Sequence, residues 1–339
     1  MTPCDYRANA VNESMPPARN PLSAVQFAAM CDVIECVVNI SEGRRADVID
    51  ELAEAIQAVS GLSLVDRSTD ASHNRSVFTV IGNAPALRTA VVALYRVAID
   101  RIDLRQHQGV HPRMGAVDVV PFVPLANTTM ETCVELATDV AEELAVRFSI
   151  PIYLYGEAAR RAECRALEAV RGKGLEDLAE RMAGDEWHPD FGPPAPHPTA
   201  GASAVGARPV LIAFNVSLDT TDIDIARQVA RAIRERDGGL RAVKALGLRL
   251  ETRGLVQVSM NLVDYRTTPL HTVYERVRAE AALRGVRVAE SELIGLAPAD
   301  ALLAAAGHAL NLARVAPSQV IEAHLDRASG RGPRPAEET

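Results

Sequence analysis

The sequence predicts an α+β fold made of two similar subdomains. Runs of β-branched residues alternate with segments of helical apolar spacing in the order β-α-β-β-α-β, and this order occurs twice along the chain. A Pro/Gly-rich segment at 187–208 lies between the two occurrences. Because the order βαββαβ is typical of the ferredoxin-like arrangement, we expect two ferredoxin-like subdomains joined by this segment. The length of 339 residues agrees with about two domains.

The first subdomain is expected to begin with a buried strand, because Val and Ile dominate the run at 33–40. The other strands of its βαββαβ unit are expected at 62–66, 77–81 and 117–125, and its helices at 47–59 and 87–102. The polar stretch 67–76 joins two of these strands and is interpreted as a loop. Pro121 and Pro124 place the last strand at an edge of the sheet or near its own end, because proline has no backbone N–H to donate.

The chain continues with a helix, a short strand and a mostly helical region, at 129–146, 151–155 and 158–182. The segment 187–208 then holds too few large apolar residues for a core element, so it is either a linker or a functional loop. The second unit repeats the order, with strands expected at 210–216, 243–250, 256–262 and 286–293 and helices at 221–236 and 270–283.

These patterns divide the chain into four regions. Residues 1–30 are expected to form a mobile extension, because Pro, Asn, Ser and Ala follow one another there without periodicity. The two subdomains are expected at 31–205 and 206–308. Residues 309–339 are charged and rich in Gly and Pro, which favours a C-terminal tail.

Composition and charge exclude several classes of function. The chain has 36 Lys and Arg against 44 Asp and Glu, so its formal net charge is −8. Nucleic-acid binders usually carry a basic excess, so we expect a small substrate and no nucleic acid. The five cysteines show no CxxC spacing, which favours free thiols in a reducing compartment over disulfides or zinc. Neither a signal-peptide pattern nor a membrane-spanning apolar run is found, so we expect a cytoplasmic protein without a membrane partner.

The densest group of polar residues is the loop 107–115, with the sequence HQGVHPRMG. A zinc pair of the HxxxH type normally lies on one face of a helix; Gly109 and Pro112 prevent a helix here, so we expect no metal. Pro112 also holds the backbone of His111 in an extended conformation. The loop is either held together by its histidines or carries a histidine that transfers protons, since His titrates near neutral pH.

Three further polar stretches allow two interpretations each. The stretch 39–43, NISEG, either caps the following helix or faces a ligand at a strand end. The stretch 66–75, DRSTDASHNR, is either a solvated hairpin loop or a site for a carboxylate and a cation together. The stretch 188–194, HPDFGPP, is either a rigid linker or a lip over a planar ligand. Nucleotide-binding and α/β-hydrolase functions lack support, because the chain has no GxGxxG, GxxxxGK[ST] or GxSxG motif.

Taken together, these stretches resemble the formiminotransferase family over about residues 33–306. The resemblance is carried by ECVVNISEG at 35–43, HNRSV at 73–77, HQGVHPRMGAVDVVPFVPL at 107–125, PIYLYGEAA at 151–159, WHPDFGP at 187–193, GARPVLIAFNV at 206–216 and LHTVYE at 270–275. It implies two ferredoxin-like subdomains with folate held between them, usually in a homodimer.

The resemblance also implies a reaction, the transfer of the formimino group from N-formimidoyl-L-glutamate to N5 of tetrahydrofolate. The products are L-glutamate and 5-formimidoyltetrahydrofolate, in histidine degradation and one-carbon metabolism. Tetrahydrofolate is then a co-substrate and no metal takes part. The family's catalytic histidine corresponds to His111. Its folate-contacting segment corresponds to Gly192, Pro193, Pro194, Ala195, Pro196, His197, Pro198, Thr199, Ala200 and Gly201.

Three features depart from the family pattern. Members commonly read VPNFSEG, where this chain has Val38 and Ile40 in place of the Pro and the Phe. Many members carry an acid at the position of Ser68, for which Asp70 is the nearest substitute. The bifunctional animal form also carries a cyclodeaminase domain, for which this chain has no room, so a stand-alone form is expected.

The chemistry of this reaction requires proton transfers. N5 must lose a proton as it attacks the amidine carbon, and the glutamate nitrogen must gain one as it leaves, so a single neutral imidazole at His111 is expected to serve both steps. Glu42 or Asp70 is expected to face the amidinium. Arg75 and Arg113 suit the substrate carboxylates, because a guanidinium binds them in a bidentate manner. The remaining expected substrate-binding residues are Asn39, Ser41 and Asn74.

Two other functions remain open at this point. One is formyl transfer between glutamate and 5-formyltetrahydrofolate, and the other is a non-catalytic folate-binding regulator, since a fold alone does not fix an activity. The intact HPRMG loop favours the enzyme, whereas Val38, Ile40 and Ser68 keep the alternatives open.

Overall fold

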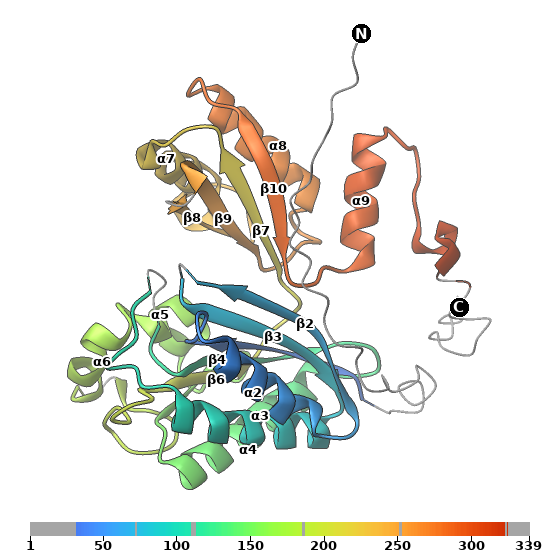
Figure 1. Cartoon of the computed structure of the whole chain (residues 1–339). Helices are drawn as coiled ribbons and strands as arrows, with labels where there is room; N and C mark the ends of the chain where they lie inside the picture. The colour runs from blue at the N-terminus through green and yellow to red at the C-terminus, as the bar shows by residue number, and fades with distance from the viewer. Residues whose placement is uncertain are drawn as a thin grey trace.

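The computed structural model describes residues 32–71, 73–109, 113–184, 187–250, 253–322 and 324. The expected extension at 1–30 and about half of the expected tail lie outside these ranges. The described chain forms two α+β units, each with its own sheet and its own apolar core. Figure 1 shows the first unit below the second. Among the described residues, no helix combines the length and the apolar character that crossing a membrane requires.

The first unit is built on a six-stranded sheet with the order β2-β3-β1-β4-β6-β5. Its strands are β1 (Ile34–Ile40), β2 (Leu62–Asp70), β3 (Arg75–Gly82), β4 (Val117–Pro124), β5 (Ile152–Gly156) and β6 (Ser203–Ala207). The first four pair with one another in antiparallel fashion, whereas β6 lies parallel to both β4 and β5. The four strands of the expected βαββαβ unit are thus present, and two parallel strands extend their sheet.

Three long helices cover one face of this sheet (Figure 1): α2 (Ala46–Gln57), α3 (Ala84–Arg101) and α4 (Met130–Phe148). Their apolar sides share one core with the inward side chains of β1, among them Ile34 and Val38. Asn83 and Thr129 cap the starts of α3 and α4 by accepting backbone N–H groups. Three short elements follow β5: the 3-10 turn η1 (Ala162–Arg165), α5 (Leu167–Arg171) and α6 (Leu175–Met182).

The β2–β3 hairpin is longer than the sequence predicts. The polar stretch interpreted as a loop is strand up to Asp70 and again from Arg75, and the described residues between them, 71, 73 and 74, lie in the turn. Arg67 lies on the helix side of β2, where its guanidinium is 2.5 Å from the carboxylate of Asp50 on α2. Because polar side chains occupy both faces here, no alternation of apolar residues marks the strands.

Of the two positions predicted for the prolines, the sheet edge is wrong, because β4 pairs with β1 on one side and with β6 on the other, whereas Pro124 does lie at the end of β4. The ladder between β1 and β4 skips the residues beside Pro121. Cys36 pairs with Phe122, and the next pair is Asn39 with Val119. A local break in the ladder therefore accommodates the proline, which has no N–H to donate.

The Pro/Gly-rich segment is more than a linker, because its last residues form β6, and all five of them are buried. Val205 and Ala207 belong to the main core, whereas Ala204 packs with Tyr153 and Tyr155 in a separate apolar cluster on the other side of the sheet. A strand enclosed between β4 and β5 and covered on both faces has room for small side chains only. It therefore lacks the large β-branched and aromatic residues from which strands are predicted.

The second unit has a four-stranded antiparallel sheet with the order β10-β7-β9-β8. Its strands are β7 (Ile212–Leu218), β8 (Val243–Leu250), β9 (Leu255–Leu262) and β10 (Val288–Ile294), its helices α7 (Ile223–Ile233), α8 (Leu270–Ala282) and α9 (Ala299–Ala309), and its 3-10 turns η3 (Glu235–Asp237) and η5 (Pro317–Gln319). The sequence prediction missed α9. Only Ala301 and Gly307 of this helix are buried, so no amphipathic spacing marks it.

Over β1 to β4, the sheet face opposite α2, α3 and α4 carries no helix, and this helix-free part turns toward the second unit (Figure 1), whereas α5 and α6 pack on the same face beside β5 and β6. Nζ of Lys244 on β8 lies 2.8 Å from a carboxylate oxygen of Glu168 on α5 and links the units. Gly295, just after β10, approaches the first sheet so closely that a Cβ there would lie 4.0 Å from oxygens of both Asp66 and Thr79. The second unit therefore contacts the first at both ends of the large sheet.

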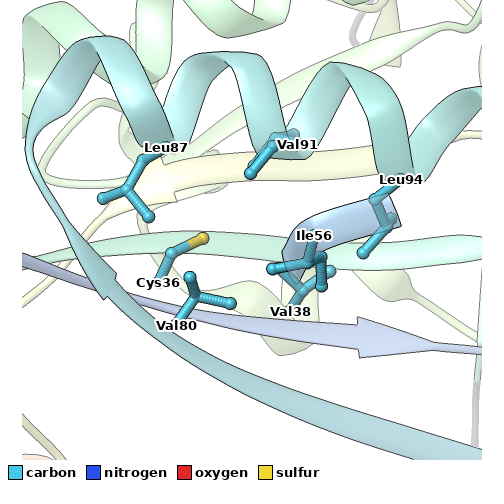
Figure 2. Close-up of a pocket in the computed structure, with 8 residues that line it drawn as sticks. Cys36, Val38, Ile56, Val80, Leu87, Val91 and Leu94 are labelled. Atoms are coloured by element: carbon cyan, nitrogen blue, oxygen red, sulfur yellow. The ribbon is translucent and has the colours of Figure 1, made fainter. Parts of the chain in front are cut away.

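Two cavities of the first unit lie away from this helix-free face. One is a small apolar void between the sheet and the helices α2 and α3 (Figure 2), lined by Cys36, Val38, Ile56, Val80, Leu87, Ala90, Val91 and Leu94. It offers a ligand no hydrogen-bonding partner besides the Cys36 thiol. The other is a dent between α3 and α4, lined by Arg88, Asp139, Glu142, Glu143, Val146 and Arg147. Cys36, Cys133 and Cys164 are free, and burial raises the pKa of each thiol.

Candidate functional site

Three loops of the first unit meet where β1 ends: residues 41–45 before α2, the β2–β3 turn, and the described parts of the connection between α3 and β4. Ser41 joins the first loop to the third. Its backbone N–H donates to the carbonyl of Ala116 at 2.8 Å, and its hydroxyl donates to the carbonyl of Gly115 at 2.7 Å. Since Ser41 is buried, its hydroxyl holds the junction of the loops together.

Asn74 connects all three loops. Its side-chain oxygen accepts the backbone N–H of Gly43 at 2.9 Å, and its side-chain nitrogen donates to the carbonyl of Gln108 at 3.0 Å. The residue is buried and has a positive φ of 49°, a conformation that Asn tolerates better than most residues. Asn74 is a residue expected to bind substrate, but its side chain is engaged in hydrogen bonds that hold the loops together.

His107 holds the third loop to the turn. Its Nε2 lies 2.9 Å from the backbone carbonyl of Asn74, and a carbonyl only accepts, so Nε2 carries the proton. Burial lowers the pKa of His107, with a smaller opposing effect of this hydrogen bond. Only glycine fits at the nearby position 109, because a Cβ there would collide with the carbonyl oxygen of His73. These contacts match the interpretation of a loop held by a histidine.

Glu42 caps α2 from three residues before its N-cap position. One carboxylate oxygen accepts the backbone N–H groups of Arg44 at 2.9 Å and Arg45 at 3.0 Å, and the other accepts the Arg45 guanidinium at 2.6 Å. Burial alone would raise the pKa of Glu42, but these hydrogen bonds together lower it. Because both oxygens already have donors, Glu42 is poorly placed to face an amidinium.

Asp70 is the other acid expected at the amidinium, and it has a different environment. Its carboxylate lies 3.0 Å from Nδ1 of His73 and accepts the backbone N–H of the same residue at 2.8 Å. Half of the Asp70 side chain is exposed. Its carboxylate therefore lies at the rim of the three-loop site, partly open to solvent.

A buried acid that the sequence did not indicate, Asp118, acts electrostatically on Arg75 and bonds to the backbone next to Arg113, the two arginines expected to bind carboxylates. One Asp118 oxygen accepts the backbone N–H of Met114 at 2.8 Å, next to Arg113. The other lies 2.5 Å from Nη2 of Arg171 on α5. Asp118 interrupts an otherwise apolar strand, which is the one signal by which sequence could have indicated a buried ion pair.

Arg75, Arg113 and Arg171 together are called the basic cluster below. Burial and then the neighbouring charge of Arg171 lower the pKa of Arg75 to about 10, against the opposing effects of Asp118 and Asp70. Arg113 donates from Nη2 to the carbonyl of His107 at 3.0 Å. No sequence pattern marks Arg171, because nothing in a helical stretch between Val170 and Gly172 distinguishes it from a surface arginine.

The expected folate-contacting segment has two differently placed ends. Gly192 is exposed, and the neighbouring Phe191 pairs with Ile152 at the start of β5. The end from His197 to Gly201 forms a tight turn and lies against the third loop. The backbone of Leu104 pairs with that of Thr199, Gly115 pairs with Gly201, and Ala116 pairs with Ala200. This end therefore lies beside the loop that contains His107 and Arg113.

His197 holds that turn in shape. Its Nδ1 accepts the backbone N–H groups of Thr199 at 3.3 Å and Ala200 at 3.1 Å. Burial lowers the pKa of His197, which favours the neutral ring that these bonds require. Gly201 has a φ of 68°, and a Cβ there would collide with the carbonyl oxygen of Met114. Close approach of the turn to the loop thus depends on glycine.

His111, the expected catalytic residue, lies outside the described residues, together with Val110 and Pro112. Asn39 lies on the helix-free side of β1, opposite Val77 and Val119, and its amide donates to the carbonyl of Val37 at 3.2 Å. Within the ranges that the structure describes, no group of three or more His, Cys, Asp and Glu side chains is arranged to hold a metal ion.

Comparisons with known proteins identify the family. The model for the formiminotransferase domain, N-terminal subdomain, matches residues 33–208, and the model for the formiminotransferase domain matches 213–323. A glutamate formimidoyltransferase of Streptococcus pyogenes serotype M1 is 44% identical over 297 residues, which are 87% of this chain and 99% of that protein. A glutamate formimidoyltransferase of Thermoplasma acidophilum is 43% identical over 88% of this chain and 98% of its own.

Two further comparisons add less. The formimidoyltransferase-cyclodeaminase of Gallus gallus is 43% identical over 82% of this chain but only 52% of its own length. A solved microcompartment protein of Desulfitobacterium hafniense aligns with 80% of this chain at 12% identity, and its TM-score of 0.22 carries no argument. The matches to both family models and to two full-length relatives show that the chain belongs to the formiminotransferase family.

Proposed function

We propose that this chain transfers the formimino group from N-formimidoyl-L-glutamate to N5 of tetrahydrofolate and releases L-glutamate. One observation carries the proposal: the 44% identity to the glutamate formimidoyltransferase of Streptococcus pyogenes, which extends over 99% of that protein. The geometry supports it, because the HPRMG loop is anchored before His111 by His107 and after it by Arg113.

We also infer a ferredoxin-like topology for both units. Relative to the chain, the βαββαβ strands of each unit lie in the order fourth, first, third, second, and all neighbours are antiparallel. This is the order that the ferredoxin-like arrangement requires. The end of β6 at Ala207 and the start of β7 at Ile212 favour a subdomain boundary at 208–211, slightly after the expected one.

His111 is proposed as the proton carrier. The amidine carbon of the protonated donor is already electrophilic, so the difficulty lies in moving protons. As N5 of tetrahydrofolate bonds to this carbon, neutral His111 takes the N5 proton. When the bond from carbon to the glutamate nitrogen breaks, the imidazolium returns a proton to that nitrogen, and the imidazole is neutral again.

The other expected residues divide into two roles. Ser41, Glu42 and Asn74 are proposed to position the loops, because their polar atoms are engaged with backbone groups of the site. Asp70 is proposed to face the amidinium from the rim, because its carboxylate is half exposed there and it is the nearest candidate to substitute for the acid that many family members carry at the position of Ser68. Arg75, Arg113 and Asn39 remain proposed contacts of the substrate.

The folate segment is proposed to use its two ends differently. The turn from His197 to Gly201 lies against the catalytic loop, which suits contact with the reacting part of tetrahydrofolate. The exposed residues near Gly192 suit contact with a more distant part. By resemblance to the family, the enzyme is further proposed to act as a homodimer in the cytoplasm. No metal is proposed to take part in the transfer.

The test is a transfer assay with a labelled donor. Purified protein is given formimidoyl-glutamate labelled with ¹³C in the formimino group, together with tetrahydrofolate, and NMR follows the label. We expect the label to appear on 5-formimidoyltetrahydrofolate at the rate at which glutamate is released, and only when tetrahydrofolate is present. A parallel reaction with formyl-glutamate tests formyl transfer. Transfer of formyl alone, or folate binding without any transfer, would contradict the proposal.

A further inference from the structure

The basic cluster gathers positive charge beside a buried acid. The carboxylate of Asp118 is only 3% exposed, is bound directly by the Arg171 guanidinium and acts electrostatically on Arg75, and it accepts the backbone N–H of Met114, next to Arg113. The acids that act on Arg75 are Asp118 and Asp70, and Asp70 is itself paired with His73. Partly buried like charges are unfavourable unless an anion accompanies them.

Two hydrogen-bond donors of this cluster lack acceptors. The Nε atoms of Arg113 and of Arg171 are both buried, and neither has a partner within the described part of the chain. Each arginine is nevertheless fixed in place through its Nη2 atom, by the carbonyl of His107 in one case and by Asp118 in the other. A buried N–H group without an acceptor is costly, so two such donors on fixed side chains indicate a site prepared for an acceptor.

The acceptor is best matched by a carboxylate. A guanidinium binds carboxylates through paired N–H groups, and an anion in the cluster would offset its positive charge. Glutamate carboxylates occur both on the formimino donor and on the tail of tetrahydrofolate. The cluster adjoins the three-loop site through Arg75, which follows Asn74, and through Arg113, which bonds to His107. This position beside the amidinium-facing Asp70 favours the donor.

We propose that Arg171, oriented by Asp118, binds a carboxylate of the formimino donor together with Arg113. The inference rests on the proposed function. Arg171 is then a substrate-binding residue that belongs to α5, outside every motif by which the family was recognised. Asp118 is a positioning residue, because its carboxylate holds both the Arg171 guanidinium and the backbone next to Arg113.

The first test compares Arg171→Gln with Arg165→Gln, a control that removes an exposed arginine from the adjacent turn η1. Loss of charge-assisted hydrogen bonds should raise the KM of Arg171→Gln for formimidoyl-glutamate by about 10- to 100-fold. The KM for tetrahydrofolate should stay unchanged, and Arg165→Gln should behave like the wild type. An increase confined to the KM for tetrahydrofolate would assign the carboxylate to the folate tail and overturn the proposal.

A second test separates recognition from folding. Calorimetric titration measures the binding of glutarate, a dicarboxylate without the formimino group, and of its neutral analogue glutaramide. Arg171→Gln should weaken glutarate binding by about 10- to 100-fold and leave glutaramide unaffected. Because Arg171→Gln leaves Asp118 without the cation that binds it, Arg171→Gln/Asp118→Asn is tested as well. Arg171→Lys should restore stability but not full affinity, since a lysine lacks the paired N–H groups.

The two tests distinguish failure of this inference from failure of the proposed function. If the wild type binds glutarate but transfers no formimino group, the proposed function fails and the carboxylate site stands. If the wild type transfers the group while Arg171→Gln keeps both the donor KM and the glutarate affinity of the wild type, the inference fails and the proposed function stands. Full recovery of donor KM and glutarate affinity in Arg171→Gln/Asp118→Asn, which has no cation at position 171, would assign Arg171 a structural role only, which overturns the inference.

Discussion

The two units share a strand order but differ in how their first helices begin. In the second unit, Asp222 caps α7 in the ordinary way, because its side chain accepts the backbone N–H of Asp224 at 2.9 Å. In the first unit, Arg45 at the N-cap position of α2 makes no such bond, and Glu42 accepts the N–H groups of Arg44 and Arg45 instead. The first strand of the second unit is thus followed by a simple helix cap, whereas the first strand of the first unit is followed by a polar network.

The helix-free faces differ as well. In the second unit, Leu246 on β8 is 55% exposed on this face, and its neighbour Lys244 reaches across to Glu168. In the first unit, charged and amide side chains gather at the strand ends, and much of their hydrogen bonding links three loops. The comparison teaches that the fold supplies the scaffold twice, whereas the loops of the first unit carry the polar groups that chemistry needs.

The largest effect on stability is expected where the first unit has a strand that the second lacks. Gly206→Ala places a Cβ against the backbone carbonyl of Tyr155 in the neighbouring strand. We expect urea unfolding to show a free energy of unfolding lower by about 3 kcal/mol. Gly184→Ala is the control, because its Cβ would meet nothing closer than 3.4 Å. Equal stability of the two variants would mean that β6 is not closely packed between β4 and β5.

A smaller effect is expected at the residue that joins the three loops. Asn74→Ala leaves the N–H of Gly43 and the carbonyl of Gln108 without partners. Asn311→Ala is a matched control, because Asn311 has a similar φ of 52° but is exposed. We expect Asn74→Ala to lose about 2 kcal/mol more than Asn311→Ala in urea unfolding. Equal losses would show that the backbone conformation matters at Asn74 and the network does not.

The smallest effect concerns the unusual cap of α2 and depends on pH. The pKa of Glu42 is lowered from its ordinary 4.5, so the ionised carboxylate stabilises the fold above pH 4.5. This contribution is lost as the pH falls through the lowered value. The stability difference between the wild type and Glu42→Gln should therefore shrink from about pH 7 to about pH 3. Glu54→Gln is the control, because it changes an exposed side chain of α2, and its stability difference from the wild type should change less between these pH values. A stability difference for Glu42→Gln that stays constant with pH would contradict the role of the cap.

The sequence predicted most elements of the repeated βαββαβ order. It predicted little of what distinguishes the first unit, which is the strand β6 and the contacts within the site. Val243–Leu250 is a strand with the expected bounds, because apolar and polar residues alternate along it. The strand Ser203–Ala207 escaped prediction, since its small residues reflect tight neighbours rather than strand propensity. In the site, polar motifs marked Glu42 and Asn74, but which backbone groups they bind depends on loops far apart in the chain. Arg171 carries no local mark, because only the fold brings it to Asp118.

The turnover numbers of two variants of one loop test most directly whether this loop carries the proton transfer. His107 holds the carbonyl of Asn74 and belongs to the framework, whereas His111 is proposed to move the protons. We predict that His111→Ala lowers kcat by roughly 10²- to 10⁴-fold while folding and folate binding stay nearly unchanged. His107→Ala should act mainly on stability or affinity. Near-wild-type turnover of His111→Ala would contradict the central claim that this loop of the first unit carries the chemistry.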